Sequence, residues 1–240
     1  MKLITTLEKR ITDALRIENE RKSAEHISSG KLSASWLGYP TQWQVLKTIG
    51  VPQKPVDDYA LRLFLRGNHV EDWVVSHLNP VEKQKPVSYR NVVGIVDALV
   101  DTAEWDFPNG VLPFEVKSVK NSKYKWILDR KSPDRSHLLQ ASLYALALGT
   151  TEFGIIYVAA DDYRTHTTVH AVADYKVEID AIIDRFDEAM SKKEIPAFAL
   201  QTEDDSWMIN PKYAKFDEAF INLSGEPALA KARTCGKIIW

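Results

Sequence analysis

The change of apolar period near residue 80 constrains the fold of this chain more than any other feature of its sequence. Residues 59–79 place apolar side chains at helical spacing, and the chain then switches to the period of strands. Three successive strands are predicted, over 81–90, 91–101 and 110–120. They are followed in order by a helix, two strands and a helix, over 136–149, 151–160, 165–173 and 176–193. This order predicts an α/β fold with a mixed central sheet flanked by helices.

The length of 240 residues is sufficient for one full α/β domain, and no segment reads as a linker between independent units. We therefore expect a single domain over 1–240. It divides into an N-terminal helical region at 1–58, a core at 59–193 and an irregular, proline-punctuated tail at 194–240. A turn-rich connection over 102–110 is expected to join the second and third strands.

The composition is that of a folded globular protein, with 45% apolar and 27% charged residues. The sequence has no apolar run long enough for a membrane span, and its N-terminus reads as an amphipathic helix rather than a signal peptide. The only cysteine, Cys235, excludes an intramolecular disulfide framework and a multi-cysteine metal cluster within one chain. These features favour a cytoplasmic protein without membrane contact.

Lysine and arginine gather in one segment, although the chain carries a formal net charge of −2. Between 115 and 135 the basic residues outnumber the acidic ones and comprise Lys117, Lys120, Lys123, Lys125, Arg130, Lys131 and Arg135. A charge run is often only a solvated face. A local positive lane can also hold phosphates whatever the global charge, so both interpretations stay open.

Polar side chains interrupt two of the predicted buried strands. Glu115 and Lys117 lie two positions apart in the third strand and therefore share one of its faces. Asp97 lies in the middle of the second strand, among apolar residues, and Glu71 lies on the preceding helix. Buried carboxylates repel each other and are costly unless a cation compensates them.

Two carboxylates that converge from neighbouring strands are a natural site for Mg²⁺ or Mn²⁺, which takes oxygen ligands and keeps several waters. The carbonyl group of Val116 can supply a third protein oxygen. Lys117 would then lie beside the metal, where it can orient or deprotonate an attacking water and stabilise a pentavalent phosphate. This is the chemistry of phosphodiester hydrolysis.

The ordered set of motifs resembles the PD-(D/E)xK nuclease superfamily. The set comprises Glu71, the Gly-x-x-Asp that ends at Asp97, and the Glu-x-Lys at 115–117. Gln140 and Tyr144, four residues apart, resemble the Gln-x-x-x-Tyr helix of the RecB-like branch, and the glycine four residues before Glu71 resembles the lambda-type exonucleases. The resemblance covers roughly 30–190. It implies a restriction-endonuclease-like core, with the Gln-x-x-x-Tyr helix contacting nucleic acid beside the scissile phosphate.

The sequence departs from this pattern in places. The proline that precedes the aspartate in the superfamily is Val96 here. The RecB-like branch often has a histidine on the first helix, so His69 or Glu71 can take that role, and Glu82 is a second-rank acidic candidate. The ends of the chain resemble the regions that hold an iron–sulfur cluster in CRISPR-associated members. With Cys235 alone that cluster is excluded, and the ends are expected to pack through aromatics such as Trp36, Trp43, Trp207 and Tyr213.

Each candidate also has an ordinary structural explanation. Asp97 can be a strand residue satisfied by a backbone or arginine partner, and Glu115 with Lys117 can be a surface ion pair of little energetic value. Ordinary surface or core roles stay open for the other candidates, namely Glu71, His69, Gln140 and Tyr144.

The resemblance implies a divalent-metal-dependent DNA exonuclease, with a role in phage or bacterial DNA recombination, repair or processing. Asp97, Glu115 and the Val116 carbonyl would hold Mg²⁺ or Mn²⁺, Glu71 would assist and Lys117 would act on the nucleophile. The DNA strand would be guided by Gln140, Tyr144 and a lysine-rich loop predicted at 120–131, with Lys120 and Lys123. A structure-specific endonuclease of the same fold and a catalytically silent DNA-binding or assembly module are the alternatives. A recombination or single-strand-binding protein is a further expected partner, while cleavage polarity, strand preference and oligomeric state stay open.

Overall fold

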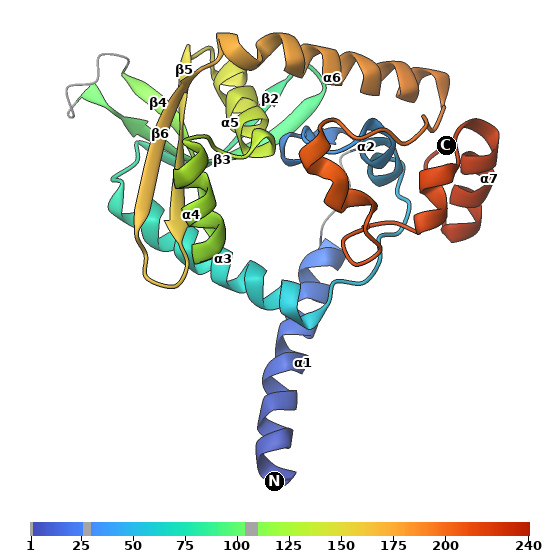
Figure 1. The fold of residues 1–240 in the computed structure, drawn as a ribbon, viewed down its shortest axis with the longest axis horizontal. Coiled ribbons are helices and arrows are strands. Elements are labelled where there is room, and N and C mark those ends of the chain that lie inside the picture. The colour runs from blue at the N-terminus through green and yellow to red at the C-terminus, as the bar shows by residue number, and fades with distance from the viewer. Residues whose placement is uncertain (1, 26–29, 104–109) are drawn as a thin grey trace.

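The computed structural model describes residues 2–25, 30–103 and 110–240 (Figure 1). The α-helices are α1 (Lys2–Glu25), α2 (Thr41–Thr48), α3 (Asp58–His77), α4 (Asn121–Arg130), α5 (Arg135–Leu148), α6 (Ala173–Lys192) and α7 (Gly225–Cys235). The strands are β1 (Leu32–Ser33), β2 (Glu82–Tyr89), β3 (Val92–Asp101), β4 (Val111–Val119), β5 (Glu152–Ala159) and β6 (Thr165–Ala171). Short 3-10 helices are η1 (Ala34–Trp36), η3 (Glu203–Ile209) and η4 (Glu218–Asn222).

One mixed sheet forms the centre of the molecule, in the order β1-β3-β4-β5-β6, with β2 paired to the other edge of β3. The successive strands β2, β3 and β4 are antiparallel, β4 and β5 are parallel, and β6 runs antiparallel to β5. The predicted mixed central sheet flanked by helices is confirmed.

Helices cover both faces of this sheet because successive side chains of β4 and β5 alternate between two cores. On one face, Val70 and Val74 of α3 pack with Phe114 and Val116 of β4. On the other face, helices α4 and α5 pack on the alternate residues of β5, such as Tyr157. Glu115 and Lys117 of β4 pair with Ile155 and Tyr157 of β5, so they belong to the face that α5 covers.

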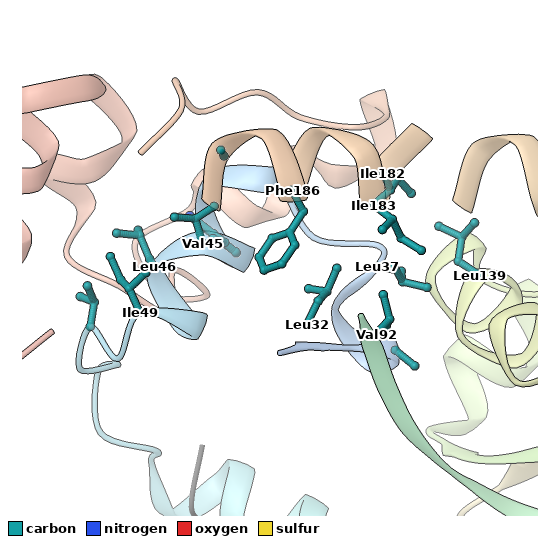
Figure 2. Close-up of a cluster of buried hydrophobic side chains, with 14 of the residues drawn as sticks. Leu32, Leu37, Val45, Leu46, Ile49, Val92, Leu139, Ile182, Ile183 and Phe186 are labelled. Atoms are coloured by element: carbon teal, nitrogen blue, oxygen red, sulfur yellow. The ribbon is translucent and has the colours of Figure 1, made fainter. Parts of the chain in front are cut away.

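A third core joins α6 to the N-terminal region. It contains residues of α2, β3, α5 and α6, all of them buried (Figure 2). Figure 2 shows Phe186 reaching from α6 toward Leu32, with Leu46 and Ile49 on the α2 side. Phe186 and Ile182 recur at helical spacing along α6, so this helix buries a continuous apolar stripe.

The N-terminal region and the C-terminal segment share the third core, and a buried glutamine adds hydrogen bonds between them. The Gln42 side-chain amide donates to the carbonyl oxygens of Pro196, Phe220 and Leu223 at 3.1, 2.8 and 2.9 Å. The aromatic packing predicted for this region is found at Trp43, which is buried.

The other predicted aromatics contribute less to this contact. The Trp43 ring lies 5.9 Å from that of Phe198 in the tail. Trp207 and Tyr213 pair with each other at 6.2 Å between ring centroids and are 42% and 50% exposed. Their contribution to holding the ends together is therefore smaller than predicted, and the amide of Gln42 supplies the specific contacts.

Two local expectations were wrong. The lysine-rich segment after β4, expected as a loop, forms α4, because Tyr124 and Ile127 lie three residues apart and bury one helical face. The tail is not irregular throughout, since Ala228, Leu229 and Ala232 give α7 a buried face of small and apolar side chains. The core of the turn-rich connection predicted at 102–110, residues 104–109, lies outside the described residues. No helix in the described part of the chain combines the length and apolar character needed to cross a membrane.

Candidate active site

Strands β3 and β4 pair along only part of their length, and the candidate residues lie where they separate. The ladder runs from Asp101 opposite Val111 to Ala98 opposite Phe114, and Asp97 and Glu115 are the next residues. Beyond this point the same edge of β3 pairs with the short β1 instead. We call this divergence of β3 and β4 the fork, with Asp97, Glu115 and Lys117 as its residues.

Asp97 bridges the two strands of the fork. Its Oδ2 accepts a hydrogen bond of 2.8 Å from the backbone N–H of Val116. This bond replaces the ladder contacts that end one residue earlier, and the side chain is 8% exposed. Burial, and then the charge of Glu115, raise the pKa of Asp97 to about 7.

Glu115 is the most buried carboxylate of the fork, at 2% exposure. Its Oε1 forms an ion pair with Lys117 and accepts a hydrogen bond of 2.8 Å from the side-chain amide of Gln140. Its Oε2 is buried and has no hydrogen-bond partner. Burial raises the pKa of Glu115.

Lys117 reaches the fork from the same face of β4 and is held by two acceptors. Besides Glu115, its Nζ lies 3.4 Å from Oε1 of Gln140. Burial disfavours the ammonium, but the carboxylates of Glu115, Asp97 and Glu71 outweigh it, so the pKa of Lys117 is raised. The arrangement places a cation among carboxylates that repel one another.

Helix α5 delivers two neutral side chains that hold this pair in place. Gln140 and Tyr144 share a face of α5, and the Gln140 amide also donates to the Tyr144 hydroxyl at 2.8 Å. The Tyr144 ring packs so closely on Gly94 that a side chain at that position would collide with it. The glycine three residues before Asp97 is therefore required by packing.

Glu71 approaches the fork from α3. It is half-buried, and burial followed by the charge of Asp97 raises its pKa to about 7. The side chain of Gln84 donates to Glu71 Oε1 at 2.7 Å. Gln84 belongs to β2, where it lies opposite Asp97 between the paired residues Lys83 and Lys85.

Gln84 was missed from the sequence, and no sequence signal identifies it. Its backbone adopts a φ of 50°, in the left-handed region that non-glycine residues rarely occupy. Such a conformation persists only where surrounding contacts hold it. The bond to Glu71, thirteen residues away in the sequence, is such a contact.

A second missed group lies behind Lys117. The buried pocket of His137 lowers its pKa well below the usual value, with further effects from the charges of Lys117 and Lys123. Its Nδ1 lies 2.8 Å from the Tyr157 hydroxyl, which accepts a hydrogen bond of 3.0 Å from the backbone N–H of Asp134. A neutral His137 adds no positive charge to the environment of Lys117.

The remaining sequence candidates lie around the fork. Glu82 pairs with Lys85, and His69 is exposed on α3. Lys120 Nζ lies 4.7 Å from the centroid of the Tyr59 ring. Lys123 pairs with Asp134 at 2.8 Å and lies 3.6 Å from the centroid of the Trp126 ring. In the part of the chain that the structure describes, none of these four contacts Asp97, Glu115 or Lys117 directly.

The fork has the donor set for one divalent cation. Within 2–25, 30–103 and 110–240, no three His, Cys, Asp or Glu side chains are grouped as ligands of one metal. Mg²⁺ needs only one or two carboxylates besides waters. Asp97 and Glu115 supply two carboxylates, and the partnerless buried Oε2 of Glu115 is an oxygen that a cation would satisfy.

No protein-family model and no curated protein matches the chain. Among solved structures, an alkaline exonuclease from Laribacter hongkongensis, LHK-Exo, aligns over 69% of this chain and 94% of its own, with 13% identity and a TM-score of 0.45. The complex of LHK-Exo with dAMP aligns over 68% and 91%, with 12% identity and a TM-score of 0.44. The protein SSO0001 aligns over 74% and 85%, with 13% identity and a TM-score of 0.48.

Proposed function

We propose that the protein is a divalent-metal-dependent deoxyribonuclease that acts as an exonuclease. One observation carries the proposal. Two buried carboxylates and a lysine, from different strands, meet at the point where the sheet opens, and one buried carboxylate oxygen there lacks a partner. A structural ion pair needs no second buried carboxylate beside it, and a buried carboxylate oxygen without a partner is costly.

Asp97, Glu115 and the Val116 carbonyl would hold Mg²⁺ or Mn²⁺, with Glu71 assisting from α3. When bound, the cation neutralises the carboxylates and polarises a phosphate oxygen and a water. The hydrogen bond from Val116 fixes the Asp97 carboxylate, and Gln140 fixes that of Glu115. These contacts preorganise the acids, so that little reorganisation is needed when substrate binds.

Lys117 would orient the attacking water or a phosphate oxygen. Its ammonium is held by Glu115 and by Gln140, which leaves its third N–H free to donate to substrate. In the hydrolysis, a water oxygen bonds to phosphorus, the bond to the leaving sugar oxygen breaks, and that oxygen takes a proton. Lys117 stabilises the negative charge that builds on the phosphate in this step.

Digestion of end-labelled DNA tests the proposal. The substrates are linear and covalently closed circular DNA, single- and double-stranded, with Mg²⁺, Mn²⁺ or EDTA. Metal-dependent shortening of linear substrates alone is expected, and its end-label pattern gives the polarity. Lys117→Ala should lose this activity, whereas Lys192→Ala, an exposed lysine on α6, serves as the matched control and should keep it. Cut circles would favour the endonuclease, and intact DNA that is still bound would favour the silent module.

A further inference from the structure

Helix α3 carries a row of aromatic and basic side chains that the catalytic proposal does not use. The row, which we call the α3 stripe, comprises Tyr59, Arg62, Arg66, His69 and Trp73. The spacing of three, four, three and four residues places them along one side of the helix. Tyr59 and Trp73 are 48% and 46% exposed, so both rings present part of their surface to solvent.

Both ends of the α3 stripe contact the segments that follow the central strands. At one end Lys120, directly after β4, lies over the Tyr59 ring. At the other end the ring of Tyr163, in the turn between β5 and β6, meets Trp73 edge-on at 5.2 Å between centroids. Tyr163 is 43% exposed and has a φ of 61°. The stripe, Lys120 and Tyr163 therefore form one continuous surface.

The stripe carries two arginines, of which Arg62 interacts electrostatically with the carboxylate of Asp58. Among the described residues no carboxylate forms an ion pair with Arg62 or Arg66, and Nε of Arg66 is buried without a hydrogen-bond partner. The acid next to Arg62 is Asp58, and its two carboxylate oxygens accept hydrogen bonds of 2.8 Å from Arg16. Two arginines without a direct ion pair to any described carboxylate, in a chain of net charge −2, make this surface suited to an anionic partner.

The stripe and the fork lie close to each other along the chain at two points, although Glu71 and Trp73 face different sides of α3. Glu71, on the inner side of α3, is two residues from Trp73, and Lys117 is three residues before Lys120. Three residues of strand span about 10 Å. The fourteen residues from Tyr59 to Trp73 span about 21 Å of helix, enough to contact several successive phosphates of a strand.

We propose that the α3 stripe is a DNA-binding track that leads the substrate strand to the fork. Arg62, Arg66 and Lys120 contact phosphates, and Tyr59 and Trp73 stack on exposed bases. Aromatic rings lie at both ends of the row and two arginines between them, the same kinds of group that proteins use to bind single strands without sequence preference. That the track leads to the fork rests on the proposed nuclease function. DNA binding by the stripe can be tested without cleavage.

Binding of fluorescently labelled DNA, followed by anisotropy in EDTA at several salt concentrations, tests the track. The double variant Arg62→Glu/Arg66→Glu should bind single-stranded DNA at least about tenfold more weakly. Its plot of log affinity against log salt should be less steep by about 1.4, because each lost phosphate contact on a single strand lowers the slope by about 0.7. Trp73→Ala should weaken binding severalfold without changing that slope. Arg62→Glu alone, at an exposed position, keeps the test decisive if the double variant does not fold.

Arg185→Glu on α6 is the matched control for Arg62→Glu, because it makes the same charge change on an exposed helical residue on the other side of the molecule (Figure 1). Equal binding by the wild type and the double variant, or an equal loss in Arg185→Glu, would overturn the track. Wild-type cleavage, measured separately with Mg²⁺, distinguishes the two proposals. If the wild type cleaves DNA and the stripe variants bind normally, the proposed function stands and the track is wrong. If the wild type does not cleave and the stripe variants bind weakly, the track stands and the proposed function is wrong.

Discussion

The carboxylate of Asp97 accepts a hydrogen bond from the backbone N–H of Val116 at 2.8 Å, across the point where β3 and β4 stop pairing. The bond ties the polar residue of one strand to the residue between Glu115 and Lys117 on the next. A buried acid thus occupies the position where a backbone carbonyl would continue the ladder. The backbone hydrogen bonds between β3 and β4 end there, and the Asp97 carboxylate lies in the fork instead.

This position of Asp97 predicts how the stability of the metal-free protein depends on pH. The pKa of Asp97 is about 7 in the folded protein and about 3.9 in an unfolded chain, so the folded state binds more protons between these values. The free energy of unfolding should therefore fall as pH rises from about 4 to about 7. Urea denaturation in EDTA at pH 5, 6, 7 and 8 measures it. Asp97→Asn should show a shallower fall, and a parallel pH dependence in both proteins would contradict the assignment.

Gln84 should show a conflict between stability and activity. Gln84→Gly relieves a backbone held at φ 50° and should raise the free energy of unfolding by up to about 1 kcal/mol. It also removes the hydrogen bond to Glu71, so activity should fall. Gln84→Asn is the control, because asparagine tolerates this conformation but its side chain is shorter. A Gly variant that is both more stable and fully active would show that Gln84 does not position Glu71.

Gln140 should matter for both stability and catalysis. Its amide donates to Glu115 and Tyr144, and its carbonyl faces Lys117, so Gln140→Leu leaves a buried carboxylate oxygen without that donor. We expect a loss of about 1–3 kcal/mol in the free energy of unfolding. Activity should fall about 10- to 100-fold, by analogy with residues that orient metal ligands.

Tyr144→Phe is the matched comparison, because it removes one hydroxyl from the same helical face. Its loss of stability should be about 1 kcal/mol and its activity should be close to that of the wild type. Chemical denaturation and initial cleavage rates measure both variants. Equal effects of Gln140→Leu and Tyr144→Phe would show that the contact with Glu115 is not the important one.

The Gln42 amide should hold the C-terminal segment to the body. Gln42→Ala removes the amide group whose two N–H bonds are shared among the carbonyl oxygens of Pro196, Phe220 and Leu223, and it should cost about 1–3 kcal/mol. Hydrogen exchange should accelerate first in 196–223 while the sheet stays protected. Gln53→Ala, which removes only a partner of Lys47, is the control and should change little. Uniform acceleration across the sheet would mean that the segment does not open separately.

The proximity of the main candidate residues was partly predictable because the signals that place them are local. Asp97 interrupts an apolar strand, Glu115 and Lys117 share a strand face, and Gln140 and Tyr144 share a helix face. The fork itself was not predictable, since the end of a ladder depends on where two strands diverge. Contacts between residues far apart in the sequence were not predictable either, because they depend on how the elements pack. Gln84 of β2 contacts Glu71 of α3, and Gln42 binds carbonyl groups more than 150 residues away.

The type of secondary structure was least predictable where charged or small residues outnumber the large apolar residues that reveal a helical period. The lysines of α4 suggest a solvated loop, and only the buried faces of Tyr124 and Ile127 show that it is a helix on the sheet. In α7 the buried positions include alanines, which carry little periodic signal. The central strands and α6, with large apolar side chains at regular spacing, were predictable from their pattern.

The most direct test of the central claim is the initial rate of nucleotide release from linear DNA, with Mg²⁺ titrated, for the wild type and Glu115→Gln. Glutamine keeps the size of the side chain and removes its charge. The wild type should require Mg²⁺, and the variant should be at least about 100-fold slower at every Mg²⁺ concentration, because a carboxylate of the fork is lost. Equal rates in the two proteins, or wild-type cleavage that persists in EDTA, would contradict a metal-dependent active site at the fork.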